Sequence, residues 1–195
     1  DYKVGLTFAL LAHLPPTQAL LSDLDAGATA RAFEGFSSLL RRRGAELAEL
    51  GLPDLAAWER AHDLEPDSVP PPPPRLVVAI DEFRVLADTH PGAMDVLMRL
   101  AAPGRSLGLH LIAATQRPSG AINATMRANM DIRLALRCVS GADSTDILGD
   151  ARASSLPRVP GRAVLADVGE LQLSYMADVA SVVGECARRW PLSSA

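Results

Sequence analysis

The sequence predicts an α/β protein, with a mostly parallel sheet flanked by helices and a β-hairpin near the C-terminus. Short continuous apolar runs, typical of central parallel strands, alternate with segments whose apolar residues recur every three or four positions. Strands that alternate with helices form parallel sheets through right-handed crossovers. Two later apolar runs flank Val168 and Gly169, and this spacing indicates a hairpin.

The first long element is predicted to be an amphipathic helix over Ala30–Leu50, which Gly51 ends. A shorter helix is expected over Pro53–His62, because proline suits the first turn of a helix. Three consecutive arginines, residues 41–43, lie on the first helix. Consecutive helix positions point to different faces, which favours a solvated stretch over a binding patch.

Residues 63–74 are expected to form a proline-rich loop within the fold. The five consecutive prolines of Pro70–Pro74 cannot occupy a helix or a central strand, and they favour a stiff, extended conformation. We interpret them as a spacer that leads into the next strand. A ligand for an aromatic groove is the alternative interpretation.

The later elements follow from the same patterns. A capping box from Ser140 to Asp143 starts one helix, and Gly149 ends it. The remaining predicted elements are strands over Leu76–Ile80, Leu109–Thr115 and Ile132–Val139, helices containing Ala93–Ala102, Ser119–Met130 and Asp178–Trp190, and a hairpin of Arg162–Asp167 with Glu170–Met176.

The composition is that of a soluble globular protein. With 195 residues, 48% of them hydrophobic and 22% charged, the chain is expected to form a single domain over residues 1–195. A net charge of -4 does not indicate a nucleic-acid binder overall, although a local basic patch stays open. Cys138 and Cys186 are too few for a disulfide framework and are expected to be reduced thiols.

The chain is expected to lie in the cytoplasm. No apolar run reaches the roughly 18 residues that a membrane span needs. We therefore expect no direct membrane contact from this segment. Any membrane attachment of a longer parent protein would come from other segments.

Polar residues follow three of the predicted strands, at the edge where ligands gather in open α/β sheets. The first strand is followed by Asp81 and Glu82, the second ends in Thr115, Gln116 and Arg117, and the third ends near Val139 and Ser140. A strand-end aspartate can hold Mg²⁺ near transferring phosphates, and a neighbouring carboxylate can activate water. A favourable carboxylate at a helix N-terminus is the alternative explanation for the acidic pair.

Several motifs together resemble the FtsK/SpoIIIE superfamily of hexameric ATP-driven translocases. The resemblance covers nearly the whole chain and implies a RecA-like fold. Within the superfamily, "GRSLG" and "LPRVPGRA" resemble the EccC-type proteins of type VII secretion and their actinobacterial relatives. The motifs that carry the resemblance are "DYKVGLTF", "LVVAIDEF", "GRSLGLHLIAATQRPSG", "MRANMDIRLALR", "ADSTDILGD" and "SLPRVPGRAVL".

The resemblance implies a role for individual residues. Asp81 and Glu82 match the Walker B pair, with Asp81 on Mg²⁺ through water, and Gln116 matches the glutamine that senses the γ-phosphate. Arg105 stands where the family tends to place an arginine that reaches the neighbouring subunit's site. Lys3 of "DYKVG" corresponds to the family's DxK strand end and is a further candidate contact to ATP.

Lesser candidates exist for the arginine role. Arg117 and Arg133 are also arginines near the predicted strands. Arg133 has the alternative of an ion pair at the edge of the core. Without the resemblance, Arg105 itself would be an ordinary cation near a helix C-terminus.

The phosphate-binding loop is missing from these residues. Its motif, G-x-x-x-x-G-K-[ST], occurs nowhere, and Lys3 is the only lysine. In the family this loop precedes the DxK strand, so we expect a chain that lacks the P-loop strand and helix, either by truncation or because the parent is degenerate. We expect such a chain to expose apolar surface and to bind ATP·Mg²⁺ weakly or not at all.

Two functions remain open from the sequence. The first is the motor domain of a ring, expected to be a hexamer, that hydrolyses ATP to move a secreted protein or double-stranded DNA. The acidic balance and the EccC-like motifs favour a secreted protein. The second is a degenerate, non-hydrolysing module that docks a signal peptide or a partner subunit.

Overall fold

The computed structural model describes residues 7–22, 26–90, 92–118, 120, 122 and 124–189. The candidate residue Lys3 lies outside the described residues. The elements of the structure, in chain order, are η1 (Ala9–His13), α1 (Ala26–Leu50), α2 (Leu55–Leu64), β1 (Leu76–Ile80), α3 (Phe83–Thr89), α4 (Ala93–Ala101), α5 (Pro103–Ser106), β2 (Leu109–Ala113), α6 (Ala124–Asn129), β3 (Leu134–Leu136), α7 (Gly141–Leu148), η2 (Arg152–Ser155), β4 (Arg162–Leu165), β5 (Gly169–Gln172) and α8 (Val179–Arg189).

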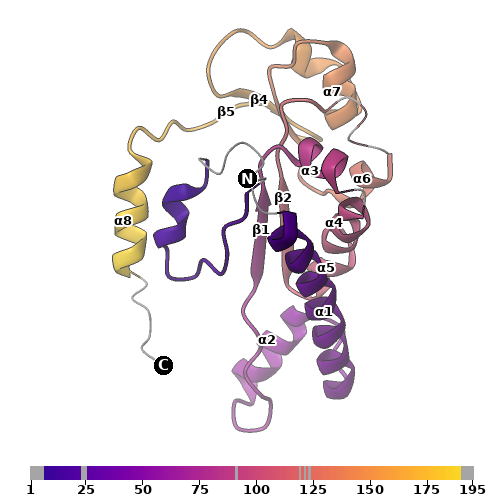
Figure 1. Cartoon of the computed structure of the whole chain (residues 1–195), viewed down its shortest axis with the longest axis vertical. Helices are drawn as coiled ribbons and strands as arrows, with labels where there is room; N and C mark the ends of the chain where they lie inside the picture. The colour runs from indigo at the N-terminus through magenta and orange to yellow at the C-terminus, as the bar shows by residue number, and fades with distance from the viewer. Residues whose placement is uncertain are drawn as a thin grey trace.

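The α/β fold is confirmed, and its centre is a parallel pair of strands. Strands β1 and β2 pair in parallel, with Leu76 opposite Leu109 and Ile80 opposite Ala113. Helices α1, α4 and α5 lie on one side of this pair, while η1 and α8 lie side by side on the other (Figure 1). The crossover from β1 to β2 through α3, α4 and α5 is the helical connection that parallel strands require.

The main core fills the space between the parallel pair and its helices. Phe83, Leu97 and Leu109 are each at most 1% exposed within this core. On the opposite face Val77 and Ile112 are 59% and 58% exposed, so the described residues leave that face of the sheet largely open. The expectation of exposed apolar surface is therefore confirmed at this face.

The third predicted strand has a different partner from the first two. Strand β3 pairs antiparallel with β4, and β4 pairs antiparallel with β5, which confirms the predicted C-terminal hairpin. This sheet packs its Ala135 and Val164 side chains into a second, smaller core with α7 and η2. The predicted third strand therefore does not extend the parallel sheet. Its predicted end near Val139 and Ser140 is not a strand end beside those of β1 and β2.

The capping signals around α7 are confirmed in detail. Ser140 accepts a hydrogen bond from the backbone N–H of Asp143 at 3.1 Å, and its hydroxyl donates to the Asp143 carboxylate at 2.7 Å. Gly149 ends the helix in the left-handed conformation, with φ of 89°. Glycine adopts this conformation without the steric cost that a β-carbon brings.

The arginine row on α1 is not uniformly solvated, so that prediction is wrong for Arg43. Arg43 is 4% exposed and donates to the carbonyl oxygens of Leu107 at 2.8 Å and Pro74 at 2.6 Å. These two residues precede β2 and β1, so one buried guanidinium ties together the approaches to both strands. Burial is the main cause that lowers the pKa of Arg43. Its Nε has no hydrogen-bond partner among the described residues.

The proline run is held against α2, which confirms its expected place as a lead into the strand. The Trp58 indole N–H donates to the Pro70 carbonyl at 2.8 Å, and His62 Nδ1 lies 2.7 Å from the Val69 carbonyl. Arg75, directly after the prolines, donates two hydrogen bonds to the Glu59 carboxylate in a bidentate ion pair, at 2.9 and 2.6 Å. The prolines therefore form a fixed spacer between α2 and β1.

Candidate functional site

The candidate site lies where β1 and β2 end. Backbone hydrogen bonds between the two chain segments continue beyond the strand ends. The Ala114 N–H donates to the Ile80 carbonyl at 2.9 Å, and the Phe83 N–H donates to the Ala114 carbonyl at 3.0 Å. Phe83 is 1% exposed and anchors the start of α3 in the core. The segment that carries Asp81 and Glu82 is thus fixed on both sides, directly beside the end of β2.

Glu82 adopts a backbone conformation that is unusual for a side chain other than glycine. Its φ and ψ are 53° and 47°, in the left-handed region. Such a conformation costs about 1–3 kcal/mol and persists where the surrounding structure enforces it. The hydrogen bonds at Ile80 and Phe83 supply that enforcement here.

The Glu82 side chain is 9% exposed and turns toward the end of β2. One of its carboxylate oxygens accepts from the Gln116 backbone N–H at 3.3 Å and from the Thr115 hydroxyl at 3.4 Å. Glu82 occupies the N-cap position of α3, but its side chain makes no capping hydrogen bond. A simple helix cap therefore does not explain this glutamate.

Asp81 is held by two donors from different parts of the chain. Its Oδ1 accepts from the Glu82 backbone N–H at 3.0 Å, and its Oδ2 accepts from the Thr7 hydroxyl at 2.9 Å. The Thr7 contact brings the segment after "DYKVG" to the strand edge, 74 positions away in the sequence. Sequence reasoning missed this contact, because nothing in the local pattern around Thr7 indicates its partner.

The structure brings together Asp81, Glu82 and Gln116, and Gln116 takes part through its backbone N–H while the residue itself is exposed. Asp81 and Glu82 offer carboxylate oxygens, the donors that Mg²⁺ prefers, and Mg²⁺ is commonly held by one or two carboxylates together with substrate phosphates. The residues present therefore fit the protein's share of a magnesium site. Mg²⁺ would supply charge neutralisation at the phosphate oxygens.

Arg105 lies at the other end of the parallel pair. It belongs to α5, before β2, and forms an ion pair with Asp131. Its side chain is 44% exposed. The five residues of β2 separate it from the acidic edge by about 17 Å at the usual rise of a strand. Arg105 therefore does not meet Glu82 within one chain.

The two lesser arginine candidates, Arg133 and Arg117, lie in different surroundings. Arg133 donates to the Leu148 carbonyl at 3.0 Å, at the C-terminal end of α7, and lies 3.5 Å from the Asp167 carboxylate. The alternative of an ion pair at the core edge is therefore confirmed for Arg133. Arg117 is exposed and its backbone N–H donates to the Thr115 hydroxyl at 3.2 Å.

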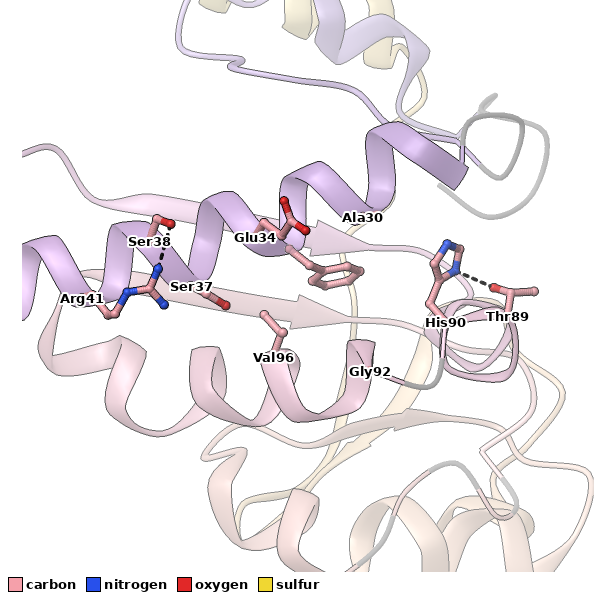
Figure 2. Close-up of a pocket in the computed structure, with 10 residues that line it drawn as sticks. Ala30, Glu34, Ser37, Ser38, Arg41, Thr89, His90, Gly92 and Val96 are labelled. Atoms are coloured by element: carbon pink, nitrogen blue, oxygen red, sulfur yellow. Dashed lines mark hydrogen bonds between the residues drawn. The ribbon is translucent and has the colours of Figure 1, made fainter.

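A hollow of about 660 Å³ lies elsewhere, between α1 and the segment joining α3 to α4. Figure 2 shows Arg41 hydrogen-bonded to Ser38 on α1, with His90 and Thr89 lining the other end of the hollow. Phe33 and Val96 supply much of its apolar lining. This hollow does not include Asp81, Glu82 or Gln116, and so it is not the strand-edge site.

Other kinds of site find no support in the part of the chain that the structure describes. Cys138 and Cys186 are free thiols, as expected. No group of three or more histidine, cysteine, aspartate or glutamate side chains within the described ranges is placed to hold a metal ion. None of the helices described here combines the length and apolar character that a bilayer-spanning segment requires.

The parallel pair β1–β2, with two carboxylates after β1 and polar residues after β2, defines an α/β protein with a polar strand edge of the kind where ligands bind. The profile described as FtsK/SpoIIIE family matches residues 1–120, which is more than half of the chain. The chain belongs to the FtsK/SpoIIIE family, and the resemblance found in its motifs is confirmed.

The relatives are type VII secretion proteins. The chain is 33% identical over 175 residues to the ESX-4 secretion system protein EccC4 of Mycobacterium tuberculosis, covering 88% of this chain and 14% of that protein. The chain thus spans about a seventh of that relative's length.

Solved structures agree with this assignment. The cytoplasmic domain of the Thermomonospora curvata type VII secretion ATPase EccC superposes with a TM-score of 0.82 at 26% identity, over 96% of this chain and 23% of that one. A second structure, ATPases 2 and 3 of the same EccC in complex with a signal sequence peptide, gives a TM-score of 0.76 at 22% identity, over 93% and 34% of the two chains. At that identity the second likeness shows the fold alone.

Proposed function

We propose that this chain is part of a cytoplasmic ATPase domain of an EccC-type translocase, with residues 1–195 belonging to that single domain. The observation that carries the proposal is the strand edge, where Asp81, Glu82 and the Gln116 segment converge on one point. Family membership and the likeness to an EccC ATPase support the same activity.

In this proposal each residue has one task. Asp81 holds Mg²⁺ through water, and Glu82 accepts the proton of the water that attacks the γ-phosphorus as the bond to ADP breaks. Gln116 senses the γ-phosphate from the neighbouring strand. Lys3, which lies outside the described residues, stays a candidate contact to ATP.

Arg105 is proposed to act on the site of a neighbouring subunit. Arg105 lies far from Asp81 and Glu82 of its own chain, so it would reach a phosphoryl group only in the site of a neighbouring subunit. An arginine supplied in trans stabilises charge that develops on that group. This role requires a ring, which we propose to be a hexamer, as the resemblance implies.

The proposed cargo is a secreted protein rather than double-stranded DNA. The relative named above belongs to a secretion system, and the chain's net charge is -4. A DNA-moving ring should present basic surface and should bind in a strongly salt-dependent way. Salt-insensitive assembly with cargo would support the protein-moving function.

A second candidate function is a docking module that does not hydrolyse ATP. One structural neighbour is described in complex with a signal sequence peptide, which supports this function. In that case the strand edge would be a remnant of a nucleotide site. Binding of a signal peptide without any effect of ATP would support this function.

Calorimetry with ATP·Mg²⁺ tests the proposal. The full-length protein should bind ATP, and Asp81→Asn should remove the magnesium dependence of that binding, because Asp81 supplies the metal's protein ligand. The 195-residue chain alone should bind weakly, since it has no G-x-x-x-x-G-K-[ST] cradle. Micromolar affinity of the chain alone would overturn that expectation, and magnesium-dependent binding by Asp81→Asn would remove Asp81 from the site.

A further inference from the structure

The Glu82 carboxylate is the part of the strand edge whose position most needs an explanation. Glu82 and Asp167 are the non-glycine residues with positive φ in the described ranges, and of these Glu82 is the buried one. A left-handed backbone sends the side chain away from the direction that a regular strand or helix start would give it. The carboxylate then needs partners in its new direction, because it is largely removed from water.

Those partners come from the segment that follows β2. The Thr115 hydroxyl and the Gln116 N–H both donate to the same oxygen of Glu82, at 3.4 and 3.3 Å. Thr115 is half-buried. Its hydroxyl oxygen also accepts from the Arg117 N–H at 3.2 Å, which leaves the hydroxyl proton directed to Glu82.

We propose that Thr115 is a positioning residue for Glu82, and that it couples the glutamate to the segment carrying Gln116. This role deepens the proposed ATPase function and rests on it for its consequence in turnover. Thr115 does not touch the phosphate in this proposal. Its hydroxyl fixes the carboxylate, so any displacement of the Gln116 segment changes the direction in which Glu82 presents its free oxygen.

The Thr115 hydroxyl and the Gln116 N–H together form a clamp on the Glu82 carboxylate. Both of these contacts are long for hydrogen bonds to a carboxylate. Hydrogen bonds to a carboxylate usually measure about 2.7–2.9 Å from a nitrogen donor and about 2.5–2.7 Å from a hydroxyl, so both contacts have room to shorten. Catalytic hydrogen bonds often tighten when substrate binds. The clamp therefore suits a part that adjusts when Gln116 engages a ligand, in contrast to a fixed structural bond.

The first test needs no ATPase activity and uses the 195-residue chain. Amide hydrogen exchange at Gln116 is measured by NMR in wild type, Thr115→Val and Thr115→Ser. Valine keeps the branched shape without the hydroxyl, so exchange at Gln116 should accelerate about tenfold, the scale of one hydrogen bond to a charged group. Serine keeps the hydroxyl and should leave exchange near the wild-type rate. Equal exchange in the valine and serine variants would overturn the proposal.

A double-mutant cycle separates the clamp from a general loosening of the fold. In a Glu82→Ala background the acceptor is gone, so Thr115→Val should add no further acceleration at Gln116. The amide of Val78, inside β1, serves as an internal control and should exchange equally in all variants. Acceleration by Thr115→Val that persists in Glu82→Ala would contradict a role through Glu82.

The second test measures turnover in the full-length protein. Thr115→Val should lower kcat about tenfold or more with the ATP dissociation constant unchanged, and Thr115→Ser should restore most of the rate. A parallel rise in the dissociation constant would contradict positioning of Glu82. If the wild-type protein hydrolyses no ATP while the exchange results hold, the clamp stands and the ATPase function fails.

Discussion

The two ends of the parallel β1–β2 pair are built in different ways. At the amino end, buried Arg43 donates two short hydrogen bonds to the segments that enter both strands, and Trp58 fixes the proline run. At the carboxyl end, Glu82 has a strained backbone and accepts two long hydrogen bonds. The contacts at the amino end secure the fold, whereas we propose that the carboxyl end serves the chemistry of the site.

Packing at the amino end leaves no room for change. Gly108, just before β2, has φ of 75°, and a β-carbon there would overlap the Leu55 side chain and approach Arg43 at 3.1 Å. The left-handed glycine at this end therefore serves close packing. At the carboxyl end the strained residue carries a carboxylate, and the left-handed backbone decides where that carboxylate points.

Arg105→Ala should have the largest effect, and it tests whether a functional residue also occurs at the amino end. In the proposed ring, loss of an arginine acting in trans should reduce ATP turnover about 10³-fold or more. Nucleotide affinity should stay nearly constant, because Arg105 is distant from its own strand edge. Phosphate-release assays and calorimetry check the two quantities.

The contradicting result for Arg105 is a matched loss of turnover and binding. That outcome would make Arg105 a structural partner of Asp131. Arg99→Ala, a change on the neighbouring helix α4, is the control and should leave turnover close to wild type.

Arg43→Met should come next and should act on stability alone. Methionine keeps much of the side-chain volume but leaves the Pro74 and Leu107 carbonyls without their donor, which should cost about 3 kcal/mol of unfolding free energy. Arg42→Met is the matched control. Its side chain is 66% exposed, so the change should stay within about 0.5 kcal/mol. Chemical denaturation measures the free energy of unfolding of both variants. Equal losses would show that the buried hydrogen bonds of Arg43 do not stabilise the fold.

The smallest effect is expected from Glu59→Gln, at the surface beside the proline run. The hydrogen bond from Arg75 is the main cause that lowers the pKa of Glu59. A lowered folded-state pKa gives stability that is present above the unfolded pKa and lost as the pH falls through the folded one. Because the pair is partly exposed, the contribution at neutral pH should be below about 1 kcal/mol.

Denaturation of wild type and Glu59→Gln at pH 7 and at about pH 3 checks this expectation. The difference between the two proteins should shrink at the lower pH, where Glu59 takes up a proton. A difference that grows as the pH falls would show that the pair does not stabilise the fold through its charge.

Much of the strand edge could be predicted from the sequence, because both the apolar runs and their polar ends are local patterns. "LVVAIDEF" and "LHLIAATQ" located β1, β2 and the residues that meet where they end. The capping box at Ser140 was equally local. These features depend on residues a few positions apart.

The features that sequence reasoning missed depend on contacts between distant segments. Arg43 looks like its two neighbours in sequence, and its burial follows from the way α1 meets the strand entries. The pairing of β3 with β4 follows from the hairpin's position, and an apolar run does not specify a partner strand. The Thr7 contact with Asp81 spans 74 positions and has no local signal.

Whether Glu82 activates water at a nucleotide site is tested most directly by comparing phosphate release by wild type and Glu82→Gln in the full-length protein. We expect Glu82→Gln to bind ATP and retain it unhydrolysed, with release slowed about 10²-fold or more, because glutamine cannot accept the proton. Phosphate release by Glu82→Gln at the wild-type rate would contradict the claim.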